Sequence, residues 1–189
     1  MSIVDRAKKI ILQPKQEWYV IDREPTSVGE LYTSYILPLA AIGPIASIIG
    51  WSVVGLSSPM AGTFRSPIGA AVIQAVVHYV LGLVGVFVLA LIIDQLAPTF
   101  AGRKNRLQAL KVAAYSSTTV WLVGIAGLVP ALSILWLLSL YSLYPLYVGL
   151  PRLMKVPGEK AMDYTVVVAI CAVVLFFIVE IIGTRTPGM

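Results

Sequence analysis

Charged residues are scarce in this chain. Only 12% of its 189 residues are Asp, Glu, Lys or Arg, whereas 58% are hydrophobic and the mean hydropathy is +0.88. A soluble domain carries about 25% charged residues, and a soluble fold of this length cannot hide so much apolar surface from water. The composition therefore excludes an ordinary soluble domain and predicts a membrane protein. The net charge of +5 gives no support for nucleic-acid binding, because basic residues beside membrane spans contact anionic lipid.

Cysteine and histidine are nearly absent as well. The single Cys171 excludes a disulfide framework and a multi-cysteine metal site. The first residues, MSIVDRAKKIILQPK, lack the apolar core and cleavage site of a signal peptide. No HExxH helix, phosphate-binding loop, paired carboxylates or nucleophile–base pair is present. We therefore expect no catalytic residues, no metal and no cofactor, and an intramembrane enzyme is the weakest of the functions considered.

Long apolar stretches dominate what the chain does contain. Five of them reach the roughly 20 apolar residues that a membrane span needs, and they cover about 35–56, 68–97, 107–128, 130–150 and 164–183. Lipid leaves no partner for free backbone groups, so each span should be a helix. Nothing in the pattern suggests a β-barrel. We predict an all-α integral membrane bundle of five transmembrane helices, forming one domain over residues 1–189.

Positive charges sort the segments between the spans into two sides. Apart from Arg65, Arg185 and Lys111, which lies at the inner edge of the third span, all Lys and Arg residues lie before the first span, between the second and third, or between the fourth and fifth. Cytoplasmic loops carry the excess of Lys and Arg in membrane proteins. The pattern predicts a cytoplasmic N-terminus and a C-terminus on the outside, with anionic lipid at the cytoplasmic face.

Residues 1–34 should form a cytoplasmic amphipathic segment. One helical face carries the apolar side chains, and Arg6 lies elsewhere; the face consists of Ile3, Val4, Ala7, Ile10 and Ile11. Pro14 should end this short helix. Two placements stay open. The helix lies on the membrane surface with Trp18 and Tyr19 as interfacial anchors, or it packs on the inner face of the bundle.

The start of the first span carries its own local signals. Ser27 followed by Glu30 fits a capping box, which predicts a helix beginning near Val28. Pro38 and Pro44 inside this span predict a kink or a re-entrant bend. Small residues at helical spacing predict close helix contacts, within the bundle or between copies; they are Gly43, Ala46, Ser47 and Gly50, with Gly124 and Gly127 in the third span.

Three separated stretches resemble a known family. They are PKQEWYVIDREPTSVGELYTSYILPLAAIGPI, DQLAPTFAGRKNRLQALKVAAYSSTTVWLVGI and LYSLYPLYVGLPRLMKVPGEKAMDYTVVVAI, in that order. Together they look like a bacterial member of the Yip1 family, over roughly Ile3 to Gly183. The resemblance implies a five-span protein with a cytoplasmic N-terminus, in a bacterial inner (plasma) membrane. Eukaryotic relatives act in vesicle traffic and partner small GTPases, a role that a bacterial plasma membrane does not offer.

Ionisable groups within the spans are few, and each costs about 2.5–3.5 kcal/mol on insertion scales. Asp94 and Lys111 flank a short break between two antiparallel spans, so their depths match. An ion pair of Asp94 with Lys111, Arg103 or Arg106 would staple this helical hairpin. Alternatively, Asp94 binds an ion or a proton.

The remaining polar candidates are Gln74, His78 and Glu180. Gln74 and His78 are four residues apart and share a helical face. His78 is either a neutral hydrogen-bonding residue between helices or, since an imidazole titrates near neutral pH, part of a proton path. Glu180 lies late in the fifth span, where it reaches water or closes a bundle contact.

Tyrosines recur around the fourth span. Tyr141, Tyr144 and Tyr147 are three residues apart with Pro145 among them, and Tyr115 lies in the third span. They form either an aromatic belt with core packing, or an inward-facing aromatic and proline cluster around a cavity where irregular backbone is tolerated.

Two functions follow. The first is a non-enzymatic membrane-organising or scaffold protein that acts through helix–helix and partner contacts, with further copies of itself or with other membrane proteins. The second is a small oligomeric channel or a proton- or cation-coupled transporter that uses the polar residues of the second and third spans.

Overall fold

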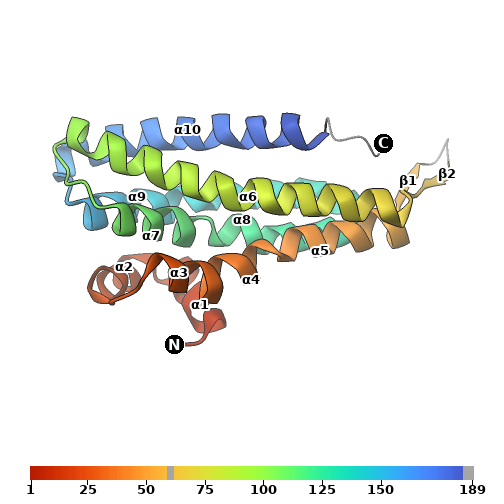
Figure 1. Ribbon diagram of the computed structural model, residues 1–189, viewed down its shortest axis with the longest axis horizontal. Coiled ribbons are helices and arrows are strands. Elements are labelled where there is room, and N and C mark those ends of the chain that lie inside the picture. Colours follow the sequence, from red (N-terminus) through yellow and green to blue (C-terminus); the bar gives the residue numbers. More distant parts are fainter. Residues whose placement is uncertain (59–61, 185–189) are drawn as a thin grey trace.

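The computed structural model describes residues 1–58 and 62–184, and it shows a helical bundle (Figure 1). Its α-helices of six or more residues are α1 (Ile3–Leu12), α2 (Pro14–Arg23), α5 (Ile42–Ile49), α6 (Ile68–Leu96), α7 (Arg106–Ser116), α8 (Thr118–Val123), α9 (Leu143–Met154) and α10 (Gly158–Thr184). The other helical segments described are α3 (Val28–Leu31), η1 (Tyr32–Ile36), α4 (Leu37–Ala40), η2 (Gly50–Val54), η3 (Ala97–Phe100), η4 (Gly124–Leu128) and η5 (Pro130–Ser142).

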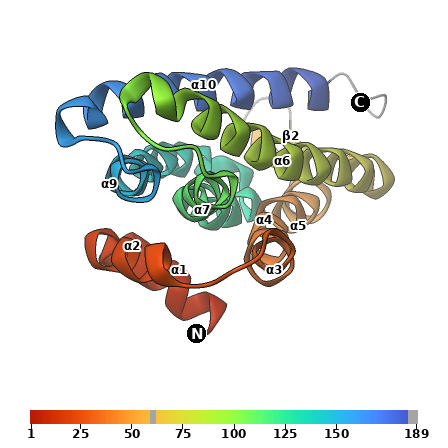
Figure 2. The same ribbon diagram turned by 60° about the vertical axis from the view of Figure 1, so that its left-hand side comes forward.

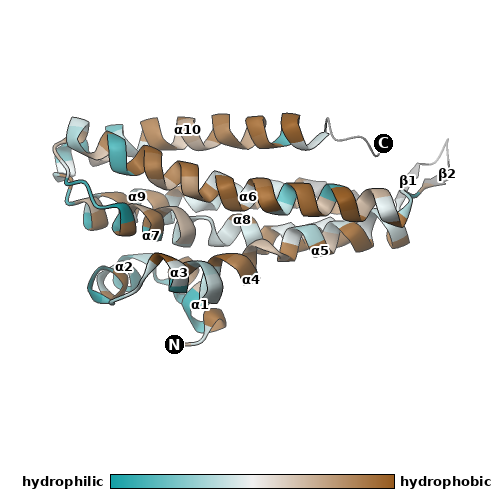
Figure 3. Cartoon of the chain, viewed as in Figure 1, coloured by the Kyte–Doolittle hydropathy of each residue, from teal (hydrophilic) through white to brown (hydrophobic). Residues whose placement is uncertain are grey.

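Five helical segments are long and apolar enough to cross a membrane. They are Val28–Val54, Ile68–Phe100, Arg106–Leu128, Ile134–Met154 and Gly158–Thr184. Figure 3 shows hydrophobic residues along these segments and hydrophilic residues gathered on α1, α2 and the loops at the same end of the bundle. The predicted fold class, a five-span all-α membrane bundle with a short amphipathic helix before it, is confirmed.

The first span is irregular where its prolines predict it. The capping box forms as expected, because the Ser27 hydroxyl accepts from the Glu30 N–H and the Glu30 carboxylate accepts from the Ser27 N–H. A π-helical turn, η1, precedes Pro38, whose ring cannot follow regular α-helical bonding. A further break falls at Ala41, between α4 and α5. These irregular turns divide the span into short helices.

A small hairpin links the first two spans, where the sequence indicated only a loop. Strands β1 (Leu56–Ser58) and β2 (Gly62–Phe64) pair antiparallel, with Leu56 opposite Phe64. The hairpin lies at the same end of the bundle as the last turn of α10, whereas α1 and α2 lie beside the opposite end (Figure 1).

The third span fills the middle of the bundle. Of its most apolar stretch, 67% is buried, against 11–22% in the other four spans. In Figure 2, α7 lies between α6 and α9, with the N-terminal helices below it. Close backbone contacts hold this arrangement where α5 meets η4. A Cβ at Gly50 would overlap the carbonyl of Gly127, and a Cβ at Gly124 would meet the backbone of Gly43. These small residues therefore serve contacts within the bundle.

Two N-terminal helices, α1 and α2, pack on the bundle as one unit, which we call the N-terminal hairpin. Pro14 ends α1 as predicted, but it also begins α2, which the sequence did not reveal. Ile10, Trp18 and Ile21 are fully buried in the main hydrophobic core. Of the two placements considered, packing on the bundle is the one observed. Trp18 is therefore a core residue, whereas Tyr19 is half exposed.

Candidate functional site

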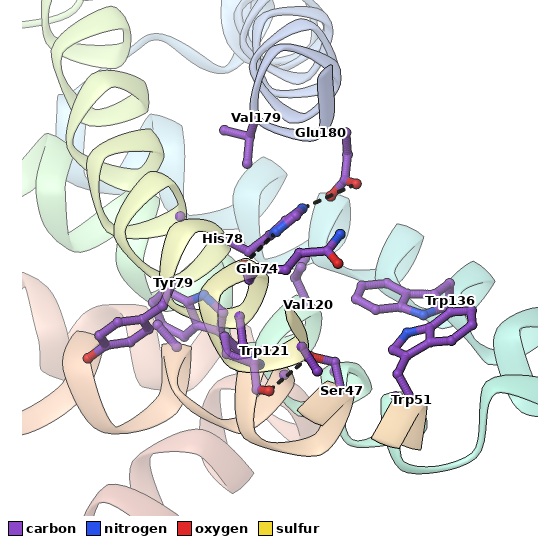
Figure 4. Close-up of a pocket in the computed structure, with 18 of the residues that line it drawn as sticks. Ser47, Trp51, Gln74, His78, Tyr79, Val120, Trp121, Trp136, Val179 and Glu180 are labelled. Atoms are coloured by element: carbon purple, nitrogen blue, oxygen red, sulfur yellow. Dashed lines mark hydrogen bonds and ion pairs between the residues drawn. The ribbon is translucent and has the colours of Figure 1, made fainter. Parts of the chain in front are cut away.

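A cavity opens between the spans at the end of the bundle away from the N-terminal hairpin. It has a volume of about 500 Å³ and lies among α5, α6, α8, η4 and the late turns of α10 (Figure 4). Its walls are largely apolar and include three of the four tryptophans, so we call it the Trp pocket; its aromatic lining residues are Trp51, Phe64, Tyr79, Trp121, Trp136 and Phe176. Its polar side chains are Ser47, Ser66, Gln74, His78 and Glu180. A concave apolar site with a few converging polar groups is typical of ligand-binding sites.

The polar centre of this pocket is an imidazole between two helices. Nδ1 of His78 lies 3.0 Å from the backbone carbonyl oxygen of Gln74, and Nε2 lies 3.7 Å from a carboxylate oxygen of Glu180. A carbonyl can only accept, so Nδ1 carries a proton and donates it. Nε2 therefore faces the carboxylate of Glu180. One further proton can reside either on Nε2 or on that carboxylate. Figure 4 shows the Gln74 amide beside this pair.

Local packing explains how two helices bring these groups together. Gln74 and His78 lie one turn apart on α6, as their spacing predicts, and both line the pocket. Glu180 comes from α10, which runs antiparallel beside α6. Gly183 lets the helices approach, since a Cβ there would lie 2.5 Å from the His78 ring. Glu180 forms a contact within the bundle, and its side chain is 42% exposed.

Asp94 and Lys111 lie outside the Trp pocket, and their predicted ion pair is wrong. Among the described residues, Asp94 forms no ion pair with Lys111, Arg103 or Arg106. Asp94 is only 3% exposed, and its Oδ1 has no hydrogen-bond partner. The predicted polar network of five residues is therefore divided between two regions of the molecule.

Lys111 instead binds the end of α2. Its Nζ donates to the carbonyl oxygens of Ile21 at 3.0 Å and Glu24 at 2.7 Å. The last carbonyls of a helix lack partners within it and carry partial negative charge, so a lysine there is favourable. These free acceptors bind the ammonium group in place of Asp94. The sequence did not reveal them, because it did not reveal α2.

A second cluster that the sequence did not reveal also holds the N-terminal hairpin. Arg6 is buried and donates to Glu17 and Glu24, and its guanidinium lies 5.7 Å from the centre of the Tyr115 ring. Asp22 of α2 meets two basic residues of the α9 end: Lys155 at 2.7 Å and Arg152 at 3.6 Å. The placement of Arg6 away from the apolar face was wrong. Helical spacing places Arg6 on the same face as Ile3, Ala7 and Ile10. This spacing could have predicted that Arg6 is buried.

Trp18 fixes the hairpin to α9. Its Nε1–H donates to the carbonyl oxygen of Pro145 at 3.0 Å, and its ring occupies the space that a side chain at Gly149 would fill. Tyr115 packs edge-on against the indole, with ring centres 6.1 Å apart.

The tyrosines do not form one inward-facing cluster. Tyr115 is buried on the central helix α7, whereas Tyr141, Tyr144 and Tyr147 are each 41% exposed. Their spacing of three places them on an outer face, in keeping with the alternative of an aromatic belt. Pro145 is buried between the two groups, where its carbonyl binds Trp18.

Metal-ligating side chains are dispersed. Within residues 1–58 and 62–184, no three His, Cys, Asp or Glu side chains come together in a way that could hold a metal ion.

Comparison with known proteins places the chain in a family. The chain is 25% identical over 156 residues to the "Inner membrane protein YohC" of Escherichia coli (strain K12), covering 80% of each sequence. The protein of the same name from Escherichia coli O6:H1 matches to the same extent. No solved structure matches the chain. A family model described as the Yip1 domain matches residues 8–181. The chain therefore belongs to the Yip1 family, and it is a multi-pass membrane protein.

Proposed function

We propose that this protein is a non-enzymatic, membrane-organising protein of the bacterial inner membrane that acts through helix–helix and partner contacts. Its relatives are named as inner membrane proteins. Its basic segments before the first span and in the second and fourth loops favour a cytoplasmic N-terminus and an outer C-terminus. Anionic lipid then meets the end of the bundle that carries the N-terminal hairpin.

The close packing around most of the third span carries this proposal. The third span occupies the position that a pore through a single chain would need, and two-thirds of its apolar stretch is buried. At the end of the bundle that carries the N-terminal hairpin, four large side chains are 0% exposed: Trp18, Ile36, Leu150 and Met154. A close-packed core of this kind suits a protein that presents surfaces to partners.

The outer faces of the spans supply those surfaces. α10 exposes Ile170, Phe177 and Ile181, each more than half uncovered. These side chains face lipid or helices of another membrane protein. Close helix packing drives association within a bilayer, where burial from water offers no further gain.

Site-specific crosslinking in cells tests the proposal. A photoreactive amino acid at Phe177 should yield adducts with a second protein or a second copy of the chain. The matched control is Val168 on the same helix, which is fully buried and should give only internal crosslinks. Purification in mild detergent should recover a mass larger than one 20.4 kDa chain. Only lipid adducts at Ile170, Phe177 and Ile181, together with a monomeric mass, would contradict the proposal.

The second candidate is a small oligomeric channel or a proton- or cation-coupled transporter, and the His78–Glu180 contact in the Trp pocket favours it. Asp94 does not belong to that pocket, so any path would use His78 and Glu180. Proteoliposomes with an internal pH dye should then show proton flux that His78→Ala abolishes while the protein stays folded. Flux equal to that of empty liposomes would reject this candidate.

A further inference from the structure

Charge is distributed unevenly around the Trp pocket. Glu180 is the only carboxylate among the described residues that line it, and none of those residues is Lys or Arg. The two other titratable groups in the lining are His78 and Tyr79, and the hydroxyl of Tyr79 donates to the carbonyl of Leu37 at 3.1 Å. The described lining residues from α5, α8, η4 and η5 contribute no ionisable side chain. Among the described lining residues, a proton on His78 is thus the one counter-charge available to Glu180.

Such a site selects its ligand by charge. An anion entering the pocket would meet the carboxylate with no basic side chain to offset it. A small metal ion would lose its hydration shell on entering, and the indole and aliphatic groups of the lining cannot coordinate it in place of water. A monovalent organic cation avoids both costs, because its charge pairs with Glu180 and its apolar body contacts the walls.

The aromatic side chains suit the same ligand. Trp51, Trp121 and Trp136 line the pocket, and tryptophan binds ammonium groups through the ring more strongly than tyrosine or phenylalanine does. In Figure 4, Gln74, His78 and Glu180 reach into the same space as the indoles of Trp51 and Trp136. A volume of about 500 Å³ is within the usual range for ligands of drug size.

From this geometry we propose that the Trp pocket binds an organic ammonium ion that carries an apolar group. The ammonium lies against Glu180 and the indoles, and the proton that His78 shares with Glu180 leaves to solvent as the ligand enters. The same chemistry is found in a free organic amine and in the amine headgroup of a membrane lipid. This inference goes beyond the proposed function, because binding at this site requires neither a partner protein nor transport.

His78 gives the site a dependence on pH. Its Nδ1 proton is donated to the Gln74 carbonyl, so only the proton on Nε2 is gained or lost as the pH changes. When both ring nitrogens are protonated, the imidazolium forms an ion pair with Glu180, and ligand binding weakens. Affinity should therefore rise with pH as the imidazole loses this second proton, and then level off.

Equilibrium binding to the purified full-length chain tests the proposal. The probe is benzyltrimethylammonium, added to protein in non-ionic maltoside micelles, which contain no amine. Tryptophan fluorescence reports binding, because three of the four tryptophans line the pocket. Benzyl alcohol and benzenesulfonate are the neutral and anionic comparison probes. We expect saturable quenching by the ammonium probe alone.

Variants locate the site and assign the roles. Glu180→Gln should weaken binding at least about tenfold, whereas Glu159→Gln, the same change at an exposed position in the first turn of α10, should leave it unchanged. Trp136→Leu should weaken binding roughly threefold to tenfold. His78→Gln should retain binding and lose the dependence on pH. The side chain of Glu180 is 42% exposed, so its variant should fold, and an unchanged melting temperature would verify this.

Two further arms separate the sources of the ligand. Phosphatidylethanolamine added to the micelles should compete with the probe if a lipid headgroup is the occupant, whereas phosphatidylglycerol should not. Competition by neither lipid would identify a free amine. Equal quenching by all three probes, unchanged affinity in Glu180→Gln, or an unchanged pH dependence in His78→Gln would overturn the proposal. None of these results bears on the crosslinks that test the proposed function.

Discussion

Replacing Trp18 by alanine should release the N-terminal hairpin from the bundle. The indole is fully buried, donates one hydrogen bond to Pro145, and fills the space beside Gly149. Truncating a buried tryptophan to alanine typically costs about 3–5 kcal/mol, and the Pro145 carbonyl loses a bond whose net value is about 1 kcal/mol. We therefore expect a loss of about 4–6 kcal/mol in the free energy of docking. Most of this loss weakens the contact between α2 and α9. The five spans stay folded, because lipid or detergent surrounds their apolar faces.

Limited proteolysis measures this release directly. Trypsin should cleave Trp18→Ala at Lys15 or Arg23 at least tenfold faster than the wild type, while the fragment containing the five spans persists. Trp18→Phe keeps most of the apolar volume and should show an intermediate rate. The matched control is Trp51→Ala, which removes an indole that is 40% exposed and should not change cleavage in the hairpin. Equal cleavage of Trp18→Ala and the wild type would refute the docking described above.

Four further substitutions test other contacts by thermal denaturation in detergent. Lys111→Met should destabilise by about 1–3 kcal/mol, since two carbonyl groups at the end of α2 lose their donor; unchanged stability would mean that the contact contributes nothing. Gly50→Ala should destabilise by about 1–3 kcal/mol through overlap with the Gly127 carbonyl. Gly69→Ala, where the space is open, should be neutral or stabilising by up to about 1 kcal/mol; equal effects at the two glycines would contradict this difference. Asp94→Leu should preserve or raise stability, because it removes a buried carboxylate oxygen without a hydrogen-bond partner, and a loss above about 1 kcal/mol would disprove this.

Features that depend on neighbouring residues could be predicted from the sequence. Span number followed from runs of apolar residues, because a bilayer imposes both the length and the helical state of each segment. The capping box at Ser27 and Glu30 followed from groups three residues apart. Irregular helix around Pro38 followed from the missing N–H of proline.

Features that depend on distant partners could not be predicted. Asp94 was the expected partner of Lys111, but its true partners are backbone carbonyls at the end of a helix that hydropathy does not reveal. His78 and Glu180 are about a hundred residues apart in the sequence, and the packing of α6 on α10 brings them within 3.7 Å. The same limitation explains the tyrosines, whose spacing defined a shared face but not whether that face points inward.

Cysteine labelling of the two chain ends tests the central claim, an odd number of crossings with a cytoplasmic N-terminus. In a Cys171→Ala background, which removes the single native thiol, Ser2→Cys and Thr184→Cys are exposed to a membrane-impermeant maleimide in spheroplasts. The account predicts that Thr184→Cys is labelled at once and that Ser2→Cys is labelled only after the membrane is opened. Labelling of both positions under the same condition would place the two ends on one side and contradict the account.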